Sequence, residues 1–473
     1  MILILIWDGL RPDMIDAELT PHLFEMAGRG VFCRASHAVF PTATRINASS
    51  LATGCYPGRH GIVDNELYVP ALNATQPVSC ADWRALQAMA DIEGGRLLTP
   101  PTLAEILRDN GRRIVAGGSG SPGTTYLTNP TVAGPVVNWA CAWPAEIEDE
   151  VSRRQGGMLT EESDSTARNR FVISALRDHL IPEYRPDVVT LWITEPDHAQ
   201  HYHGLKSAEA RAMLRQVDND VHALIGHLQQ TRGADELICF VISDHGFETV
   251  QGGIDPDAEL VEAGLISAPG SGEVVRTLGS LYVNGDARNR LADIVAFMQS
   301  HDWVSGVFVR DDLLTQCPDA MPQSAVYGGH SRSAEILFSY RWTDEANAEG
   351  VPGTTYCPGH IAATHGSSSP YTVNNTLIAW GAGIKSAITS DVPCGIVDIA
   401  PTVLHMLGIA APESMQGRVL DEILVGGPDP ADLEITHSTR EAEYHTSAGR
   451  RRQVVRYSHV NGYRYLDQVN LLP

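Results

Sequence analysis

The fold class of this chain is decided by the stretch Ile2-Leu3-Ile4-Leu5-Ile6-Trp7, which Asp8-Gly9 follows directly. An unbroken apolar run of this length, rich in β-branched residues, is typical of a strand buried on both faces, as in a parallel sheet. The run is much shorter than the ~20 residues of a membrane span, and no basic segment precedes it as in a secretory signal. The stretch therefore predicts a central strand with Asp8 at its carboxyl end.

Four more apolar runs follow, and helical periodicity separates them. The predicted strands are Arg113–Ala116, Asp187–Ile193, Leu237–Ile242 and Thr376–Trp380, and the predicted helices are Pro21–Ala27, Leu103–Asp109, Asp164–His179, Ala208–Gln229, Ala287–Gln299 and Ile399–Leu407. Strands that alternate with helices predict an α/β fold, here a three-layer sandwich whose mainly parallel central sheet carries helices on both faces.

Residues 251–359 break this rhythm with Pro/Gly turns and the short predicted strands Thr277–Val283, Val307–Arg310 and Ile336–Tyr340. We expect these residues to form a smaller inserted cap subdomain, and residues 1–250 and 360–473 to form the catalytic core. Near the C-terminus, two apolar runs flank Asn461-Gly462, which predicts a two-residue hairpin turn.

The balance of charge excludes two classes of partner. The 473 residues contain 34 Lys and Arg against 57 Asp and Glu, a formal net charge of −23. Nucleic-acid polymers and anionic membrane surfaces are bound by clustered cations, so neither is expected as a partner. The eight cysteines are scattered without a C-x-x-C pair. This predicts free thiols, a reducing compartment and a cytoplasmic location.

Acidic and imidazole side chains stand beside the predicted strands, at the ends where open α/β sheets place their sites. The candidates are Asp8, Asp197, His201, Asp244, His245 and His365. Zn²⁺ binds both imidazole nitrogen and carboxylate oxygen, and a tetrahedral ion uses four ligands. Six candidates are too many for one such ion, so the sequence predicts a site for two.

A denser pattern follows the first candidate. Residues 41–65 read PTATRINASSLATGCYPGRHGIVDN. This block resembles the type I phosphodiesterase/nucleotide pyrophosphatase family of the alkaline phosphatase superfamily, whose block is approximately P-T-x-T-x-x-N-x-x-S-x-x-T-G-x-Y-P-x-x-H-G-I-x-x-N. The motifs E-P-D-x-x-x-H at 195–201, S-D-H-G at 243–246 and H-G at 365–366 extend the resemblance. It implies an alkaline-phosphatase-like sandwich and a metal-dependent hydrolase.

The resemblance also implies roles for single residues. Thr44 would be the nucleophile, at the start of a helix over Arg45–Ala52, and Asn65 would donate to a phosphoryl oxygen. One metal would be held by Asp197, His201 and His365, and the other by Asp8, Thr44, Asp244 and His245. The implied cofactors are two Zn²⁺ ions, with Mn²⁺ as the alternative. The implied reaction is hydrolysis of phosphodiester or pyrophosphate bonds in a small molecule or nucleotide, through a phospho-threonine intermediate. The sequence is also compatible with a homodimer.

Arg45 departs from the family's pattern. Nucleotide pyrophosphatases usually have an aromatic residue there, on which the base of the substrate stacks. The resemblance therefore does not imply that this chain binds a nucleotide substituent beside Thr44. Arg45 either follows its helix into solvent or turns inward as a substrate-binding residue. His330 and Arg332 are further candidates for binding an anionic substrate.

Three alternatives stay open. Phosphonoacetate hydrolases share the threonine, the asparagine and the metal ligands and cleave a C–P bond, but they add lysines where this chain has Gly117-Gly118-Ser119-Gly120. Phosphosugar mutases of the same superfamily return the phosphoryl group to their substrate. A non-catalytic relative would only bind a phosphorylated ligand.

Cys55 offers a competing nucleophile. The run from Cys55 to Arg59 matches the C-x-P-x-R signature by which related sulfatases convert cysteine to formylglycine. In sulfatases that cysteine lies nine residues before the T-G pair of the following block, and the residue nine before Thr53 is Thr44. The spacing therefore gives the nucleophile's position to Thr44.

This spacing makes a first prediction. Thr44→Ala should lower kcat for a chromogenic phosphodiester at least about 10³-fold, because the oxygen that forms the covalent bond is removed. Cys55→Ala should stay within about threefold of the parent in the same assay. Retained activity in Thr44→Ala, or formylglycine found by mass spectrometry at position 55, would contradict the assignment.

Overall fold

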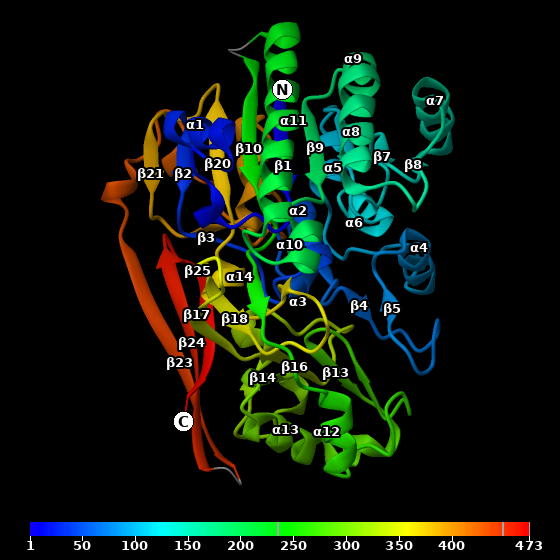
Figure 1. The fold of residues 1–473 in the computed structure, drawn as a ribbon, viewed down its shortest axis with the longest axis vertical. Coiled ribbons are helices and arrows are strands. Elements are labelled where there is room, and N and C mark those ends of the chain that lie inside the picture. The colour runs from blue at the N-terminus through cyan, green and yellow to red at the C-terminus, as the bar shows by residue number, and fades with distance from the viewer. Residues whose placement is uncertain (234–235, 447–448, 473) are drawn as a thin grey trace.

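The structure is a computed structural model that describes residues 1–233, 236–446 and 449–472 (Figure 1). A nine-stranded sheet forms the centre of its larger part, in the spatial order β21-β2-β20-β10-β1-β9-β6-β7-β8. The strands are β1 (Ile2–Trp7), β2 (Val31–Cys33), β6 (Ile114–Gly118), β7 (Val136–Asn138), β8 (Ala142–Trp143), β9 (Val188–Ile193), β10 (Ile238–Ile242), β20 (Leu377–Gly381) and β21 (Ile388–Ser390).

Strand β1 lies in the middle of this sheet. It pairs in parallel with β10 on one side and with β9 on the other. Ile4 and its two alternate neighbours join one buried apolar cluster, whereas Leu5 and its alternate neighbours join a second cluster on the opposite face. Because both faces are covered, every position of the strand is apolar.

Helices cover both faces of the sheet, which confirms the three-layer sandwich. The cluster on the Ile4 face includes side chains of α2 (Thr44–Thr53), α5 (Leu103–Asp109) and α15 (Ile399–Met406). The cluster on the Leu5 face includes side chains of α1 (Pro21–Arg29), α7 (Ala145–Gln155), α8 (Ser165–Ala175) and α11 (Ala208–Arg232). The other helices are α3 (Pro57–His60), α4 (Trp83–Ile92), α6 (Pro122–Leu127), α9 (Ile181–Tyr184), α10 (Asp197–His203), α12 (Pro256–Glu262), α13 (Leu291–Ser300) and α14 (Pro370–Val373).

Two predicted helices are divided in the structure. The segment Asp164–His179 begins as α8, which Asp164 caps by accepting a hydrogen bond from the Ala167 N–H at 2.7 Å, but it ends as a π-helical turn over Leu176–Leu180. Pro182 follows this turn and has no N–H to continue the α-helical pattern. The segment predicted from Ala287 starts as a 3-10 turn, and α13 begins at Leu291.

Strand β20 adds a detail that the sequence pattern does not contain. It runs antiparallel to β10, with Leu377 opposite Ile242 and Gly381 opposite Ile238. A parallel strand needs a crossover that carries the chain back across the sheet. Here the chain enters β20 directly at the carboxyl end of β10, so the segment before β20, which contains His365, is held at that end.

Residues 251–359 build a further apolar core. Its helices and the strands of its five-stranded sheet lie in the lower part of Figure 1. A five-stranded sheet, flanked by α12 and α13, has the order β12-β13-β16-β14-β15. The strands are β12 (Val274–Arg276), β13 (Ser280–Val283), β14 (Val304–Val309), β15 (Met321–Pro322) and β16 (Ile336–Tyr340). The extent of the inserted subdomain itself remains a prediction.

The C-terminal strands form a long three-stranded sheet of β23 (Ile435–Thr446), β24 (Gly449–Val460) and β25 (Tyr463–Leu472). The predicted Asn461-Gly462 turn joins β24 to β25, with Val460 opposite Tyr463. Val469 of β25 shares a buried cluster with Phe308 of β14. The C-terminal strands therefore pack on the five-stranded sheet, although the sequence assigns them to the catalytic core.

Short strands complete the fold. Two of them, β3 (Ser36–His37) and β22 (Cys394–Gly395), pair with each other, as do β4 (Glu66–Leu67) and β5 (Val78–Ser79). A four-stranded sheet has the order β17-β18-β11-β19 and consists of β11 (Glu248–Val250), β17 (Trp342–Ala346), β18 (Pro352–Thr355) and β19 (Ala363–Thr364).

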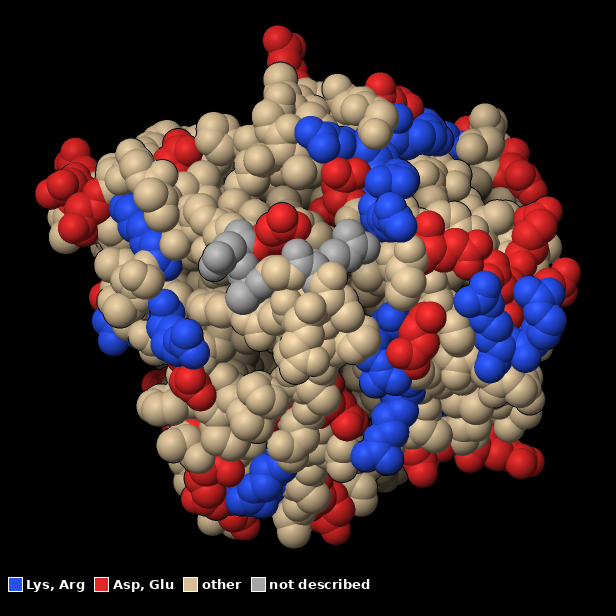
Figure 2. Space-filling model, turned by 90° about the horizontal axis from the view of Figure 1, so that it is seen from above, with Lys and Arg blue, Asp and Glu red and all other residues tan. Residues whose placement is uncertain are grey.

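The eight cysteines are buried as free thiols, as predicted. Figure 2 shows acidic and basic side chains interspersed over the face seen from above. Among the described helices, none combines the length and the apolar character needed to cross a membrane.

A buried carboxylate lies in the four-stranded sheet. Glu248 Oε2 accepts a 2.6 Å hydrogen bond from Ser367 Oγ, whereas Oε1 is buried and has no partner in the described part of the chain. Burial raises the pKa of Glu248 to about 7 from its usual 4.5. The folded protein therefore keeps this proton over a pH range in which the unfolded chain has lost it, so its contribution to stability falls as pH rises from about 4.5 to about 7.

We expect Glu248→Gln to flatten this dependence. Between pH 5 and pH 8 the unfolding free energy of the parent should fall by about 2–3 kcal/mol more than that of the variant, from about 1.4 kcal/mol per unit of pKa shift. Urea unfolding in a chelator measures the difference. Glu345→Gln, on the exposed strand β17 of the same sheet, is the matched control and should keep the parental slope. Equal slopes for the parent and Glu248→Gln would contradict the argument.

Candidate metal centre

The six predicted ligands meet at the carboxyl edge of the central strands. Asp8 follows β1, and Asp244 with His245 follows β10. Asp197 and His201 lie on α10, which begins at Asp197 after β9, so their i, i+4 spacing puts both on one face. His365 follows β19. Three adjacent strands and one returning segment therefore deliver every candidate to one place.

Two groups of ligand atoms form there. Asp8, Asp244 and His245 offer atoms that lie within 4.8 Å of one another, and so do Asp197, His245 and His365. His245 Nε2 lies between the groups, 3.2 Å from Asp244 Oδ2, 3.5 Å from Asp8 Oδ1 and 4.0 Å from Asp197 Oδ1. His201 Nε2 lies 3.4 Å from Asp197 Oδ1. His245 thus belongs to both groups, whereas the resemblance assigns it only to the group of Asp8 and Asp244.

The three histidines are held in one orientation. The Nδ1 atom of His201 lies 2.8 Å from the Ala363 carbonyl oxygen, that of His245 lies 3.0 Å from the Gly246 carbonyl oxygen, and that of His365 lies 2.9 Å from the Thr42 carbonyl oxygen. A carbonyl only accepts, so each Nδ1 carries the proton. With Nδ1 as the donor, Nε2 is the nitrogen of each ring that faces the aspartates and would bind a metal.

The carboxylates lack compensation within the protein. Asp8 Oδ1, Asp197 Oδ1 and Asp244 Oδ2 are buried without hydrogen-bond partners among the described residues. Their companion oxygens on Asp8 and Asp244 accept from Trp192 Nε1 at 2.9 Å and from the Gly9 N–H at 3.1 Å. Buried carboxylate oxygens are costly unless they are paired or coordinate a metal. The donor set therefore fits two divalent cations.

The pKa values reflect this crowding. Burial, together with the charges of Asp244 and Asp197, holds the pKa of Asp8 well above its usual value. Burial also raises the pKa of Asp244. Burial acts in the same direction on Asp197, but the adjacent His201 and His365 outweigh it and lower the pKa of that carboxyl. Burial and the neighbouring His245 keep the pKa of His365 well below its usual value, so this ring stays neutral as a ligand must.

Thr44 and Asn65 lie in the same cavity. Thr44 is the first residue of α2, and its Oγ1 lies 3.4 Å from His245 Nε2. Asn65 Oδ1 accepts from the Arg45 N–H at 3.0 Å, so its Nδ2 amide hydrogens remain as donors. The cavity has a volume of about 340 Å³ and is lined by Asp8, Thr44, Arg45, Asn65, Glu66, Ser79, Gly120, Ser121, Thr124, Thr194, Asp197, His201, Leu278, Thr364 and His365.

Asp64 is a supporting residue that the sequence pattern does not single out. It is buried, and its Oδ2 accepts from Thr277 Oγ1 at 2.5 Å and from the Gly279 N–H at 3.2 Å. Its Oδ1 accepts from the N–H of Asn65 at 2.7 Å. These bonds tie Asn65 to the segment before β13. The signal available in the sequence is a carboxylate directly before the asparagine of the block.

The structure separates the three candidates for binding an anion. Arg45 turns into the cavity, where Nη2 donates to Ser121 Oγ at 3.1 Å. His330 and Arg332 are not among the residues that line this cavity. The donors of Arg332 are used by Glu93, by the Gly61 carbonyl at 3.1 Å and by the Leu97 carbonyl at 2.8 Å, so this cation is already part of the fold. His330 Nε2 lies 3.2 Å from Thr99 Oγ1.

Cys55 lies outside the cavity. Its Sγ donates to the Ser414 carbonyl at 3.0 Å, and burial raises its thiol pKa to about 11. A thiol is nucleophilic as its thiolate, so this cysteine is inert near neutral pH.

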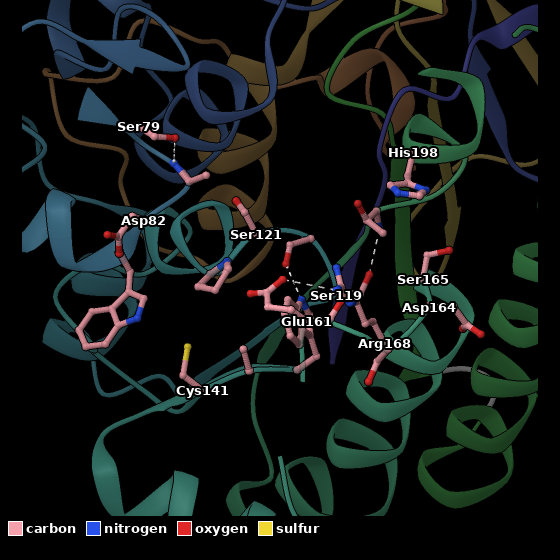
Figure 3. Close-up of a pocket in the computed structure, with 18 of the residues that line it drawn as sticks. Ser79, Asp82, Ser119, Ser121, Cys141, Glu161, Asp164, Ser165, Arg168 and His198 are labelled. Carbon is pink, nitrogen blue, oxygen red and sulfur yellow. Dashed lines mark hydrogen bonds and ion pairs between the residues drawn. The ribbon is translucent and has the colours of Figure 1, made fainter. Parts of the chain in front are cut away.

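A second, larger cavity adjoins the first. Its volume is about 850 Å³, and it shares Ser79, Gly120, Ser121 and Thr194 with the smaller one. Figure 3 shows its polar lining, which includes Ser119, Glu161, Arg168 and His198. The smaller cavity thus contains the metal ligands, and the larger cavity has space for a substituent of a bound phosphate ester.

This fold and site belong to a known class of metal-dependent sandwich proteins. The chain belongs to the type I phosphodiesterase/nucleotide pyrophosphatase family, because the family model with that description matches residues 2–342.

Two curated relatives resemble the chain over half its length. Ectonucleotide pyrophosphatase/phosphodiesterase family member 1 of Rattus norvegicus is 26% identical over 250 residues, which are 51% of this chain and 23% of that protein. Venom phosphodiesterase of Macrovipera lebetinus is 25% identical over 248 residues, 51% of this chain and 25% of that protein. The matched region thus spans about a quarter of the length of these relatives.

Two solved structures share the fold. Murine ectonucleotide pyrophosphatase / phosphodiesterase 5 superposes with a TM-score of 0.60 at 18% identity, covering 87% of this chain and 96% of that one. A mutant of the alkaline phosphatase PafA superposes with a TM-score of 0.66 at 17% identity, covering 89% of this chain and 98% of that one. These likenesses confirm the alkaline-phosphatase-like sandwich.

The ligand geometry predicts two equivalents of divalent metal per chain, measured by mass spectrometry of the metals after loading and desalting. His365→Ala should retain mainly one, because Asp8, Asp244 and His245 stay in place. His360→Ala, at an exposed histidine, is the control and should retain two. A parent protein that holds one equivalent or none would contradict the two-ion site.

Proposed function

We propose that this chain hydrolyses phosphodiester or pyrophosphate bonds through a covalent phospho-threonine at Thr44, with two bound metal ions. The observation that supports this most directly is the position of Thr44 Oγ1, 3.4 Å from His245 Nε2, in the cavity that Asp8 and Asp197 also line. Membership of the phosphodiesterase family supports the same reaction class.

The metal ions would be zinc, or manganese as the alternative. Asp197, His201 and His365 would hold one ion, Asp8, Asp244 and His245 would hold the other, and His245 lies close enough to both groups to be shared. When bound, such ions supply the positive charge that lowers the pKa of a hydroxyl and stabilises the departing oxygen.

The chain itself positions the phosphoryl group. Thr44 opens α2, where the first backbone N–H groups have no helical acceptor and favour an anion. Asn65 Nδ2 donates to a non-bridging oxygen, and Asp64 keeps Asn65 in place. The substituent that remains on phosphorus has room in the adjoining 850 Å³ cavity.

The reaction has two displacements. The Thr44 oxygen attacks phosphorus, the P–Oγ1 bond forms, the bond to the leaving oxygen breaks, and the Thr44 proton passes to the departing oxygen. A water molecule then attacks the same phosphorus, the P–Oγ1 bond breaks, and Thr44 recovers its proton. Beyond the Thr44 oxygen, the transfer of the phosphoryl group needs little chemistry from the protein, so positioning and charge carry the catalysis.

A substrate panel tests the proposal. Chromogenic phosphodiesters, phosphomonoesters, phosphonates and sulfate esters are assayed with the chelated protein and after metals are restored. Metal-dependent turnover of the phosphodiesters supports the proposal. Cleavage restricted to C–P bonds, transfer of the phosphoryl group within the substrate, or no turnover of any ester would each contradict it.

Asn65→Ala should lower kcat/KM for bis-p-nitrophenyl phosphate about 10²-fold, because removing one preorganised donor to a developing oxyanion costs about that much. Metal content and melting temperature should stay unchanged. Asn110→Ala, at the exposed end of α5, is the matched control and should keep the parental rate. An Asn65→Ala rate within threefold of the parent would remove Asn65 from the mechanism.

A further inference from the structure

Arg45 lies where the two cavities meet. Its Nη2 donates to Ser121 Oγ at 3.1 Å, and Ser121 lines both the metal cavity and the larger cavity. The backbone N–H of Arg45 is bonded to Asn65, so the root of the side chain is fixed beside the nucleophile. The guanidinium thus reaches from the phosphoryl site toward the larger cavity.

Arg45 forms no ion pair within the described part of the chain, although its charge partly offsets the rise in the pKa of Asp8. Its side chain is half-buried, and its Nε is buried without a hydrogen-bond partner among the described residues. Its Nη2 donates to the neutral Ser121 Oγ. Arginine also presents a planar fork of donors that matches carboxylate and phosphate oxygens.

Two arginines line the larger cavity, and both lie against tryptophan rings. Arg84 lies over the Trp83 ring at 4.6 Å, and Arg168 lies over the Trp139 ring at 3.9 Å. Arg168 Nη2 also donates to the Glu161 carbonyl at 2.8 Å and lies 3.6 Å from its carboxylate. Arg45 itself lines the metal cavity.

We propose that Arg45 binds an oxyanion on the substituent of the substrate that enters the larger cavity, so that the preferred substrate is a phosphate ester with a second acidic group, a carboxylate or a phosphate. This inference rests on the proposed function.

Binding is measured first, because it does not depend on turnover. The metal-loaded protein is titrated calorimetrically with 3-phosphonopropionate and with its carboxyl methyl ester, which differ in charge but hardly in size. The parent should bind the acid at least about 20-fold more tightly, a discrimination of about 1.8 kcal/mol. Arg45→Met keeps the length of the side chain and removes the charge, and it should bind both within threefold of each other.

The matched control is Arg59→Met, an exposed arginine of the same sequence block that lies outside both cavities. It should bind both ligands like the parent. Arg45→Lys should recover part of the preference, because the charge returns without the fork. A preference that survives in Arg45→Met would overturn the inference, and so would a parent that binds acid and ester equally.

Hydrolysis separates this inference from the proposed function. The probes are three phosphodiesters in which one ester group is 4-nitrophenyl. The other ester group comes from glycolic acid, from methyl glycolate or from 2-hydroxyethylphosphonate, so that a carboxylate arm and a phosphonate arm are compared with a neutral one. The parent should favour one acidic arm over the methyl ester at least tenfold in kcat/KM, and Arg45→Met should reduce that ratio to within about threefold. An equal loss on all three would place Arg45 on the transferred phosphoryl group and overturn the inference. If the parent cleaves none of them, the proposed function fails and the calorimetric result alone decides the role of Arg45.

Discussion

The site depends on buried carboxylate oxygens of three aspartates, Asp8, Asp197 and Asp244, at one edge of an apolar sheet. Each leaves a buried oxygen without a hydrogen-bond partner in the described structure, and the three repel one another. In a low-dielectric interior such charges are tolerated only beside compensating cations. Burial of these oxygens costs folding free energy, and bound metal ions would offset that cost. Metal binding would therefore stabilise this edge of the sheet.

The geometry of the sheet makes this arrangement feasible. Neighbouring strands lie about 4.8 Å apart. Residues that follow β1, β9 and β10 therefore lie close enough to share ions. Trp192 Nε1 and the Gly9 N–H bind the second oxygens of Asp8 and Asp244. The antiparallel entry of β20 matters for the same reason, because it keeps the segment that contains His365 at the carboxyl end of β10. Carbonyl acceptors at Thr42, Gly246 and Ala363 then fix which nitrogen of each ring faces the aspartates.

Next to this shared machinery lies a part that is particular to this chain. The residue after Thr44 is an arginine, whose half-buried side chain lines the metal cavity and donates to Ser121 where the two cavities meet. Positive charge at that position changes which substituents are stabilised without touching the atoms that react. Serine hydroxyls, two tryptophans and engaged arginines line the larger cavity. Differences in this lining can alter substrate choice while the metal ligands stay the same.

The sequence by itself determined the α/β class, the central strand Ile2–Trp7 and the list of residues able to bind metal. These follow from local facts: an apolar run, helical periodicity, and the spacing that sets Asp197 and His201 on one face of α10. The tertiary structure alone decided the direction of β20, the inward course of Arg45 and the exclusion of Arg332 from the cavity. The partners responsible are far away in the chain, Ser121 at 76 positions from Arg45 and Glu93 at 239 positions from Arg332. Contacts of this range depend on how whole elements pack, and no local pattern of residues encodes them.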